Sequence, residues 1–188
     1  MAYGSRGRGK RRDDERLKGK DGNDMTHIIS MLVENHQGVL ARIAGLFSGR
    51  GYNLESITVG ATVDPTVSRL TLVCGGDDPV VEQIKKQLNR LIDVIKVLDL
   101  TDSPSLRREL ALIKVSAKGR QRGEIFQVAE VFKAQVMDMG IDTMTLEIAG
   151  QPDKIDDFIS LLLPFGVVET ARSGVVAIER GKKNGKQG

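Results

Sequence analysis

Residues 33–40 are Val33-Glu34-Asn35-His36-Gln37-Gly38-Val39-Leu40, and the hydrophobic pattern changes its period within them. A short run over 28–33, apolar except for Ser30, leads into this stretch and predicts a buried strand. Apolar residues at helical spacing follow over 39–47 and predict an amphipathic helix. The sequence therefore predicts a strand, a short polar loop that ends in a glycine, and a helix in direct succession.

The predicted loop, 35–38, has the residues of an anion-binding turn. The first N–H groups of a helix lack intrahelical partners, and the helix dipole makes that end partly positive. Gly38 has no side chain, so a carboxylate could approach the backbone, and Asn35 offers an amino acid both a donor and an acceptor. A capped strand-to-helix turn without any ligand is the alternative interpretation of the same residues.

The elements after this helix complete one predicted domain, 25–101. Alternating apolar residues predict strands over 52–61 and 67–74, and a further strand over 94–100. Before that last strand, Asp78 as N-cap and Pro79 at the first helical position begin a helix. Its apolar stripe consists of Val81, Ile84, Leu88 and Leu91. The order βαββαβ predicts a ferredoxin-like arrangement, with two helices on one face of an antiparallel sheet.

The pattern then repeats after a predicted linker, 102–106. The same periodicities predict strands over 110–117, 134–140, 143–150 and 167–179, the last single or paired around Ser173-Gly174, and helices over 122–132 and 152–163. The predicted fold class is therefore α+β, with two ferredoxin-like βαββαβ domains in tandem, the second spanning 107–180. In place of the 35–38 loop, the second domain has the basic run Lys118-Gly119-Arg120-Gln121-Arg122-Gly123, which either faces an anion or is solvated.

Basic charge is concentrated at the two ends of the chain. Residues 1–24 hold 8 Lys/Arg and 5 Asp/Glu, and residues 181–188 hold 3 Lys, which leaves 17 basic and 20 acidic residues between them. Both ends have few large apolar residues, so we expect disordered tails; the acidic residues of the first argue against a transit peptide. Strands 28–33 and 67–74 have no aromatic residue for base stacking, so no nucleic-acid partner is expected.

The sequence contains no pattern typical of an enzyme. Its two histidines, His27 and His36, have no partner at metal-ligand spacing, and no nucleophile elbow or phosphate-binding loop occurs. The single cysteine, Cys74, excludes an internal disulfide, and a helix N-terminus explains Asp77 and Asp78. No apolar stretch reaches the roughly 20 residues of a membrane span and no secretory leader is present, so we expect a cytoplasmic protein.

Longer motifs around the same loop point to a family. The runs 27–35, 38–43 and 45–56 resemble an ACT domain and, more narrowly, the small regulatory subunits of acetolactate synthase (acetohydroxyacid synthase). Further matching motifs are Asp64-Pro65-Thr66, Ser68-Arg69 and Ala171-Arg172-Ser173-Gly174-Val175-Val176. The resemblance extends from residue 26 to residue 181.

The resemblance implies an effector site between two copies of the chain. In this family two ACT domains join their sheets edge to edge, and valine or another branched-chain amino acid binds at the homodimer interface. Carried onto this sequence, the contacts are a loop of one chain and the second strand of its neighbour: Asn35, His36, Gln37, Gly38, Val39 and Leu40, with Asn53, Ile57 and Val59. His36-Gln37 is a bulky pair for a contact loop, which bears on the choice of effector.

The resemblance also implies a larger partner. Small subunits of this family act in branched-chain amino acid biosynthesis and perform no catalysis. They bind a large subunit that carries thiamine diphosphate, magnesium and often FAD, raise its activity and confer feedback inhibition, so no cofactor is expected on this chain. That large subunit condenses pyruvate with pyruvate or 2-oxobutyrate. Two other functions stay open: a free-standing amino-acid sensor, and an RNA-binding ferredoxin-like protein.

Overall fold

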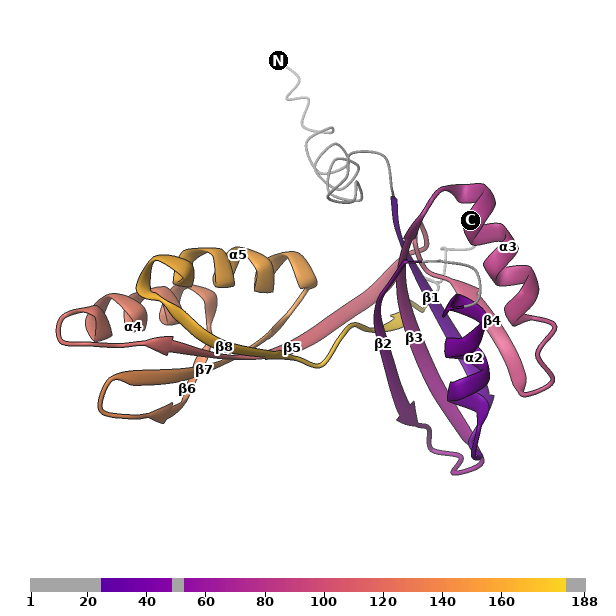
Figure 1. Ribbon diagram of the computed structural model, residues 1–188, viewed down its shortest axis with the longest axis horizontal. Coiled ribbons are helices and arrows are strands. Elements are labelled where there is room, and N and C mark those ends of the chain that lie inside the picture. The colour runs from indigo at the N-terminus through magenta and orange to yellow at the C-terminus, as the bar shows by residue number, and fades with distance from the viewer. Residues whose placement is uncertain (1–24, 49–52, 182–188) are drawn as a thin grey trace, which may run out of the picture. The chain divides into compact units, whose positions relative to one another are not determined.

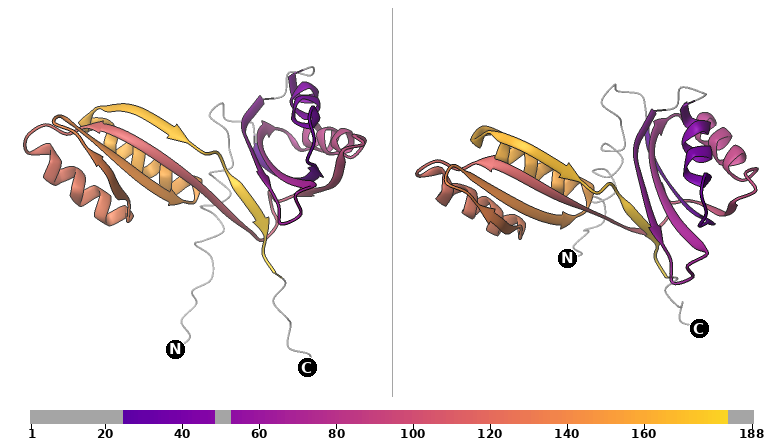
Figure 2. Two further views of the ribbon diagram at one scale, coloured as in Figure 1. Left: turned by 90° about the horizontal axis from the view of Figure 1, so that it is seen from below. Right: turned by 60° about the horizontal axis from the view of Figure 1, so that its bottom comes forward.

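The computed structural model describes residues 25–48 and 53–181, which form two compact units that divide between Pro104 and Ser105 (Figures 1 and 2). The predicted tail 1–24 lies outside the described residues, as do 182–188 of the predicted tail 181–188. Residue 52, the predicted start of a strand, also lies outside them.

The first unit is built from four strands and two helices in the predicted order. They are β1 (Met25–Glu34), α2 (Val39–Ser48), β2 (Asn53–Ala61), β3 (Val67–Gly76), α3 (Asp78–Leu88) and β4 (Val94–Asp99). All strand pairs are antiparallel, and the order across the sheet is β2-β3-β1-β4. Both helices cover the same face of this sheet (Figure 1). The predicted ferredoxin-like arrangement is confirmed.

The core of the first unit lies between that sheet face and the two helices. Alternate residues of the central strands enter it, because successive side chains of a strand point to opposite faces. The fully packed set is mostly aliphatic, as expected from a sequence with few aromatic residues: Ile29, Met31, Val33, Val39, Ile43, Phe47, Leu70, Leu72, Cys74, Val81, Ile84 and Leu88. Each buried Leu or Ile side chain contributes about 1.5–3 kcal/mol of transfer free energy.

Two local predictions in this unit were wrong. The N-cap of α3 is Asp77, not Asp78, because the Asp77 carboxylate accepts a hydrogen bond from the N–H of Val80 at 3.1 Å. The helix also ends at Leu88, so Leu91 packs against the core from the following turn.

A bulge at Glu55 interrupts the register of β2 with β3, and it turns both Leu54 and Ile57 toward the core.

The second unit repeats the same topology with an extension. Its elements are β5 (Ser105–Ser116), α4 (Gln121–Phe132), β6 (Gln135–Met139), β7 (Thr143–Gly150), α5 (Pro152–Leu162), the 3-10 helix η1 (Leu163–Phe165), β8 (Val167–Arg172) and β9 (Val176–Glu179). The order β6-β7-β5-β8 corresponds strand for strand to that of the first unit. The segment 167–179, predicted as either one strand or a pair, forms the pair β8 and β9.

The predicted linker 102–106 overlaps a strand. β5 begins at Ser105, and its first residues, Ser105 to Arg108, pair with β9. The polar composition around these residues is typical of a linker, and only the pairing with a segment far along the chain makes them extended. The local sequence pattern around 105–108 cannot predict pairing with a segment so far along the chain.

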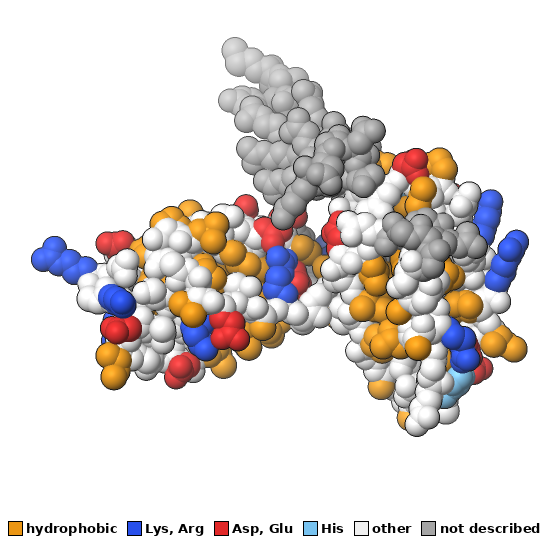
Figure 3. All heavy atoms as spheres, viewed as in Figure 1, with side chains coloured by type: hydrophobic (Ala, Val, Ile, Leu, Met, Phe, Trp, Pro, Cys, Tyr) orange, Lys and Arg blue, Asp and Glu red, His pale blue; other side chains and the backbone are white. Residues whose placement is uncertain are grey.

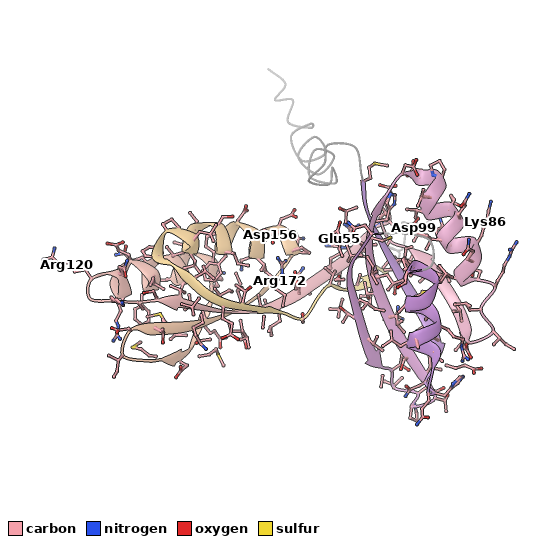
Figure 4. The ribbon with its side chains drawn as sticks, viewed as in Figure 1. Glu55, Lys86, Asp99, Arg120, Asp156 and Arg172 are labelled. Carbon is pink, nitrogen blue, oxygen red and sulfur yellow. The ribbon has the colours of Figure 1, made fainter. Side chains whose placement is uncertain are left out.

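Arg172 joins three elements of the second unit. Its guanidinium donates two hydrogen bonds to the Glu109 carboxylate of β5, at 2.9 and 2.6 Å, and one to Asp156 of α5 at 2.6 Å. Figure 4 shows Arg172 and Asp156 near each other where β8 passes α5. The Glu109 side chain is only 4% exposed. The hydrogen bonds to Glu109 and Asp156 raise the pKa of Arg172.

We expect Arg172→Met to lower the free energy of unfolding of this unit by about 2–3 kcal/mol. The substitution leaves buried Glu109 without its charge partner, and the partial exposure of Arg172 reduces the cost below that of a fully buried pair. Urea unfolding of the full chain measures the loss. The double variant Arg172→Met, Glu109→Met should recover most of it, since two apolar side chains need no partner. A double variant no more stable than the single one would contradict this assignment.

Candidate functional site

Loop 35–38 is held between two other turns of the first unit. The N–H of Asn35 donates to the carbonyl of Thr66 at 2.7 Å, in the turn between β2 and β3. The N–H of Glu34 donates to the carbonyl of Asp93 at 2.9 Å, in the turn before β4. Backbone hydrogen bonds from both sides therefore position the loop.

The side chain of Asn35 already has a partner within the chain. Its Nδ2 donates to the carbonyl of Pro65 at 2.9 Å. An asparagine amide has a second N–H and a carbonyl oxygen, which can serve a ligand while this bond orients the group. Asn35 is thus both a turn residue and a preorganised polar group.

Gly38 occupies the position where α2 begins. Its φ of +88° lies in the region that side chains disfavour, and a Cβ placed there would have no neighbour within 4 Å. The carbonyl of Gly38 accepts from the N–H of Arg42 at 3.0 Å, which starts the helix. The backbone at Gly38 is therefore open to an approaching group.

The remaining loop residues divide between core and surface. Val39 is buried at 3% exposure and belongs to the core, so its side chain cannot contact a ligand. Leu40 is 47% exposed, and Gln37 is also on the surface. The predicted site thus consists mainly of backbone groups around Gly38, with Leu40 as its aliphatic neighbour.

Within one chain, the two halves of the predicted site do not meet. Asn53 pairs with Gly75 at the end of the sheet where β1 begins, whereas the loop follows Glu34, which pairs with Val67 at the opposite end. At about 3.3 Å per residue, these ends lie roughly 25 Å apart. Ile57 packs against the core, and Val59, farther along the edge strand β2, is 46% exposed.

Four charged or titratable side chains, which sequence spacing did not predict as a cluster, meet beside the loop. His36 Nε2 lies 3.0 Å from Asp93 Oδ1 and 3.2 Å from Glu34 Oε2. Arg42 of α2 binds both oxygens of Asp93, at 2.8 and 3.0 Å. We call Glu34, His36, Arg42 and Asp93 the His36 cluster. Figure 3 shows a histidine beside cationic and acidic side chains near the end of the unit that carries these loops.

Asp93 and Arg42 are the members of the cluster that sequence analysis missed. The Asp93 side chain is only 6% exposed, although it lies in a turn directly after exposed Ile92. A lone acidic residue after a helix has no periodicity that would mark it as buried. A hydrogen bond to the carbonyl of Gln37, and the carboxylates of Asp93 and Glu34, raise the pKa of His36.

Other residues singled out from the sequence have structural roles. His27 is buried, and its Nε2 donates to the carbonyl of Gly76 at 3.1 Å. Burial raises the pKa of Cys74 to about 11, which keeps the thiol protonated at neutral pH. In the second unit, Arg122 of the basic run 118–123 donates to the carbonyl of Ala117, before that run, and to the carbonyl of Gly140, in the turn between β6 and β7.

Among the described residues, no helix is long and apolar enough to cross a bilayer.

Two family profiles match the chain, one in each unit. Residues 29–96 match the acetohydroxyacid synthase small subunit-like ACT domain. Residues 108–181 match the family described as the small subunit of acetolactate synthase. The two matches together cover most of the part of the chain that the structure describes.

Similar proteins cover nearly the whole folded chain. A probable acetolactate synthase small subunit of Archaeoglobus fulgidus is 50% identical over 159 residues, 85% of this chain and 99% of that protein. An acetolactate synthase small subunit of Aquifex aeolicus is 50% identical over 162 residues, 86% of this chain and 84% of that protein. The crystal structure of the small subunit of acetolactate synthase from Thermotoga maritima has a TM-score of 0.76 at 41% identity, over 84% of this chain and 99% of that one. These matches, together with the two ferredoxin-like units, show that the chain belongs to the family of acetolactate synthase small subunits.

Proposed function

We propose that this chain is a non-catalytic regulatory subunit that binds the large catalytic subunit of acetolactate synthase and raises its activity. In this proposal it also confers feedback inhibition by valine or another branched-chain amino acid. Thiamine diphosphate, magnesium and FAD belong to the catalytic subunit. Family membership supports the partner, and the geometry of loop 35–38 supports the effector.

The open backbone at Gly38 is the observation that carries the effector assignment. The loop ends at the first turn of α2, whose N–H groups lack intrahelical partners, and no atom lies within 4 Å of a Cβ placed at Gly38. Such a helix start binds a carboxylate through main-chain atoms alone. The carboxylate of an amino acid fits this position, and the Asn35 amide, oriented by Pro65, is available to its polar groups.

A second copy of the chain would complete the site. β2 is an edge strand, so one side of its backbone is free to pair with another strand. Antiparallel pairing of β2 with the β2 of a second copy would bring that copy's Asn53 to the end of the sheet that carries loop 35–38. The separation of these groups within one chain therefore favours a site that exists only in a homodimer.

The aliphatic neighbours favour a branched effector side chain. Leu40 and Val59 are exposed, and Ile57 lies on the same edge strand as Val59. Valine, leucine and isoleucine differ by single methylenes, which an apolar pocket separates by about 1–3 kcal/mol. Feedback follows if the effector binds one quaternary state better than another, with a typical coupling of about 1–3 kcal/mol.

Calorimetric titration of the full chain with valine, leucine and isoleucine tests this proposal. We expect saturable binding of at least one of them at no more than one molecule per chain, and no binding of threonine as the control ligand. The same effector should inhibit the large subunit only when the small subunit is present. Absence of binding, both alone and with the large subunit, would refute the effector assignment.

We expect Gly38→Asp to abolish effector binding, because it places a carboxylate where the effector carboxylate would lie. The chain itself has room for the new side chain, so the loss would not come from an internal clash. Gly166→Ala is the matched control, since Gly166 has a similar φ of +92° in the second unit and imposes similar backbone strain. Calorimetry on both variants separates the two effects. Unchanged affinity in Gly38→Asp would mean that the site lies elsewhere.

We expect Asn35→Ala to weaken effector binding by about 1–3 kcal/mol, because a polar group of the ligand loses its partner. Asn89→Ala is the control, since it removes a comparable exposed bond, from Asn89 Nδ2 to the Lys85 carbonyl at 2.8 Å, elsewhere in the unit. Titration calorimetry gives both affinities. If both variants bind equally well, Asn35 is only a turn residue.

A further inference from the structure

Both ring nitrogens of His36 face hydrogen-bond acceptors. Nδ1 lies 3.0 Å from the carbonyl oxygen of Gln37. Nε2 lies 3.0 Å from a carboxylate oxygen of Asp93 and 3.2 Å from one of Glu34. A carbonyl and an ionised carboxylate only accept, so each nitrogen must carry a hydrogen for these contacts to be favourable. The arrangement is therefore that of the imidazolium, the doubly protonated ring.

The charges of the His36 cluster balance only in that state. Glu34, at the end of β1, and Asp93, before β4, each carry a negative charge, and Arg42 of α2 neutralises one of them. The imidazolium of His36 neutralises the other. A neutral ring keeps only one N–H, so it would direct a nitrogen lone pair either at the Gln37 carbonyl or at the carboxylates, and the cluster would keep one uncompensated negative charge beside buried Asp93.

The same ring is joined to the loop proposed to bind the effector. Nδ1 donates to the carbonyl of Gln37, the residue before Gly38. The backbone carbonyl of Asp93 accepts a hydrogen bond from the backbone N–H of Glu34. The proton on Nε2 therefore connects the loop 35–38 to the turn that precedes β4. A neutral ring has a single N–H, so either this connection or the one to the Gln37 carbonyl is lost, while the backbone bonds remain.

We propose that His36 is a proton-dependent switch of loop 35–38: the imidazolium holds the loop through both ring nitrogens, on the Gln37 carbonyl and on Glu34 and Asp93, and loss of one proton breaks one of these connections and loosens the loop. The consequence for the effector rests on the proposed function, because the held loop is the one whose backbone at Gly38 would receive the carboxylate. An imidazolium beside that position also favours an anionic group. Effector binding is then tighter in the protonated state.

The direction of the pH dependence follows from the pKa of His36. Its hydrogen bond to the Gln37 carbonyl, and then the carboxylates of Asp93 and Glu34, raise this pKa above its ordinary value of 6.5. A group with a raised pKa in the folded state contributes fully below its unfolded value, and the contribution is lost as the pH rises through the raised value. Loop 35–38 is therefore held at acidic pH and loosened as the pH rises through the raised pKa of His36, above 6.5.

NMR of the full chain with labelled histidine tests the switch without any effector. The chain has two histidines, His27 and His36, so loss of one signal in His36→Gln assigns both. We expect His36 to titrate above 6.5 and the amide signals of 35–38 to shift with the same midpoint. Glu34→Gln should lower that midpoint, whereas Glu55→Gln, an exposed glutamate on β2 labelled in Figure 4, should not.

Three results of this titration would overturn the proposal. The first is a His36 midpoint at or below the ordinary value, and the second is a set of loop signals that ignores the histidine titration. The third is a midpoint that changes when EDTA is added, because a metal ion would then lie between His36 and the two carboxylates instead of a proton.

Calorimetry at two pH values tests the consequence for the effector. We expect the valine dissociation constant to rise about fivefold or more between about pH 6 and about pH 8.5, the lower end of common couplings between sites. His36→Gln should bind with an affinity that is the same at both pH values. Valine binding that is equally tight at both pH values in the unmodified chain would refute the switch and leave the proposed function intact. If no branched-chain amino acid binds, with or without the large subunit, while the NMR results are as expected, the effector assignment fails and the switch stands.

Discussion

The pairing of β1 with β3 is the constraint on which the first unit depends. It runs in a single register from Met25 opposite Gly76 to Glu34 opposite Val67. A shift by one residue would turn every side chain of β1 to the other face and empty the core of Ile29, Met31 and Val33. The same register determines where β1 ends, and therefore where loop 35–38 lies relative to the turns that contact it.

The loop is accordingly a junction of three segments that are distant in the sequence. The turn at Pro65 and Thr66 holds Asn35 from one side, and the turn at Asp93 holds Glu34, His36 and Arg42 from the other. A ligand that contacts the backbone at Gly38 would thus contact a part of the chain connected to both. In the proposed site, this connection would link a bound effector to the edges of the sheet, where the proposed dimer would pair.

The two units show how one topology supports different loop chemistry. Both sheets have the same strand order, and in both a loop connects the first strand to the first helix. In the first unit the loop has open backbone at Gly38, and its His36 side chain lies against the carboxylates of Glu34 and Asp93. In the second unit the guanidinium of Arg122 donates to the carbonyls of Ala117 and Gly140 and so connects the start of α4 to the turn between β6 and β7. Sites, rather than folds, distinguish the two halves.

The sequence by itself determined the fold class, most of the core and the family, because hydrophobic period and glycine placement are local properties of the chain. At Gly38 the sequence predicted an accessible backbone, because glycine has no side chain, and a Cβ placed there would have no neighbour within 4 Å. Only the tertiary structure decided the bulge at Glu55, the pairing of Ser105–Arg108 with β9, and the distance between Asn53 and the loop. It also decided that Asp93 is buried against His36 and Arg42. The reason is physical: strand register and charge pairing depend on which distant segments meet, and no local period records that choice.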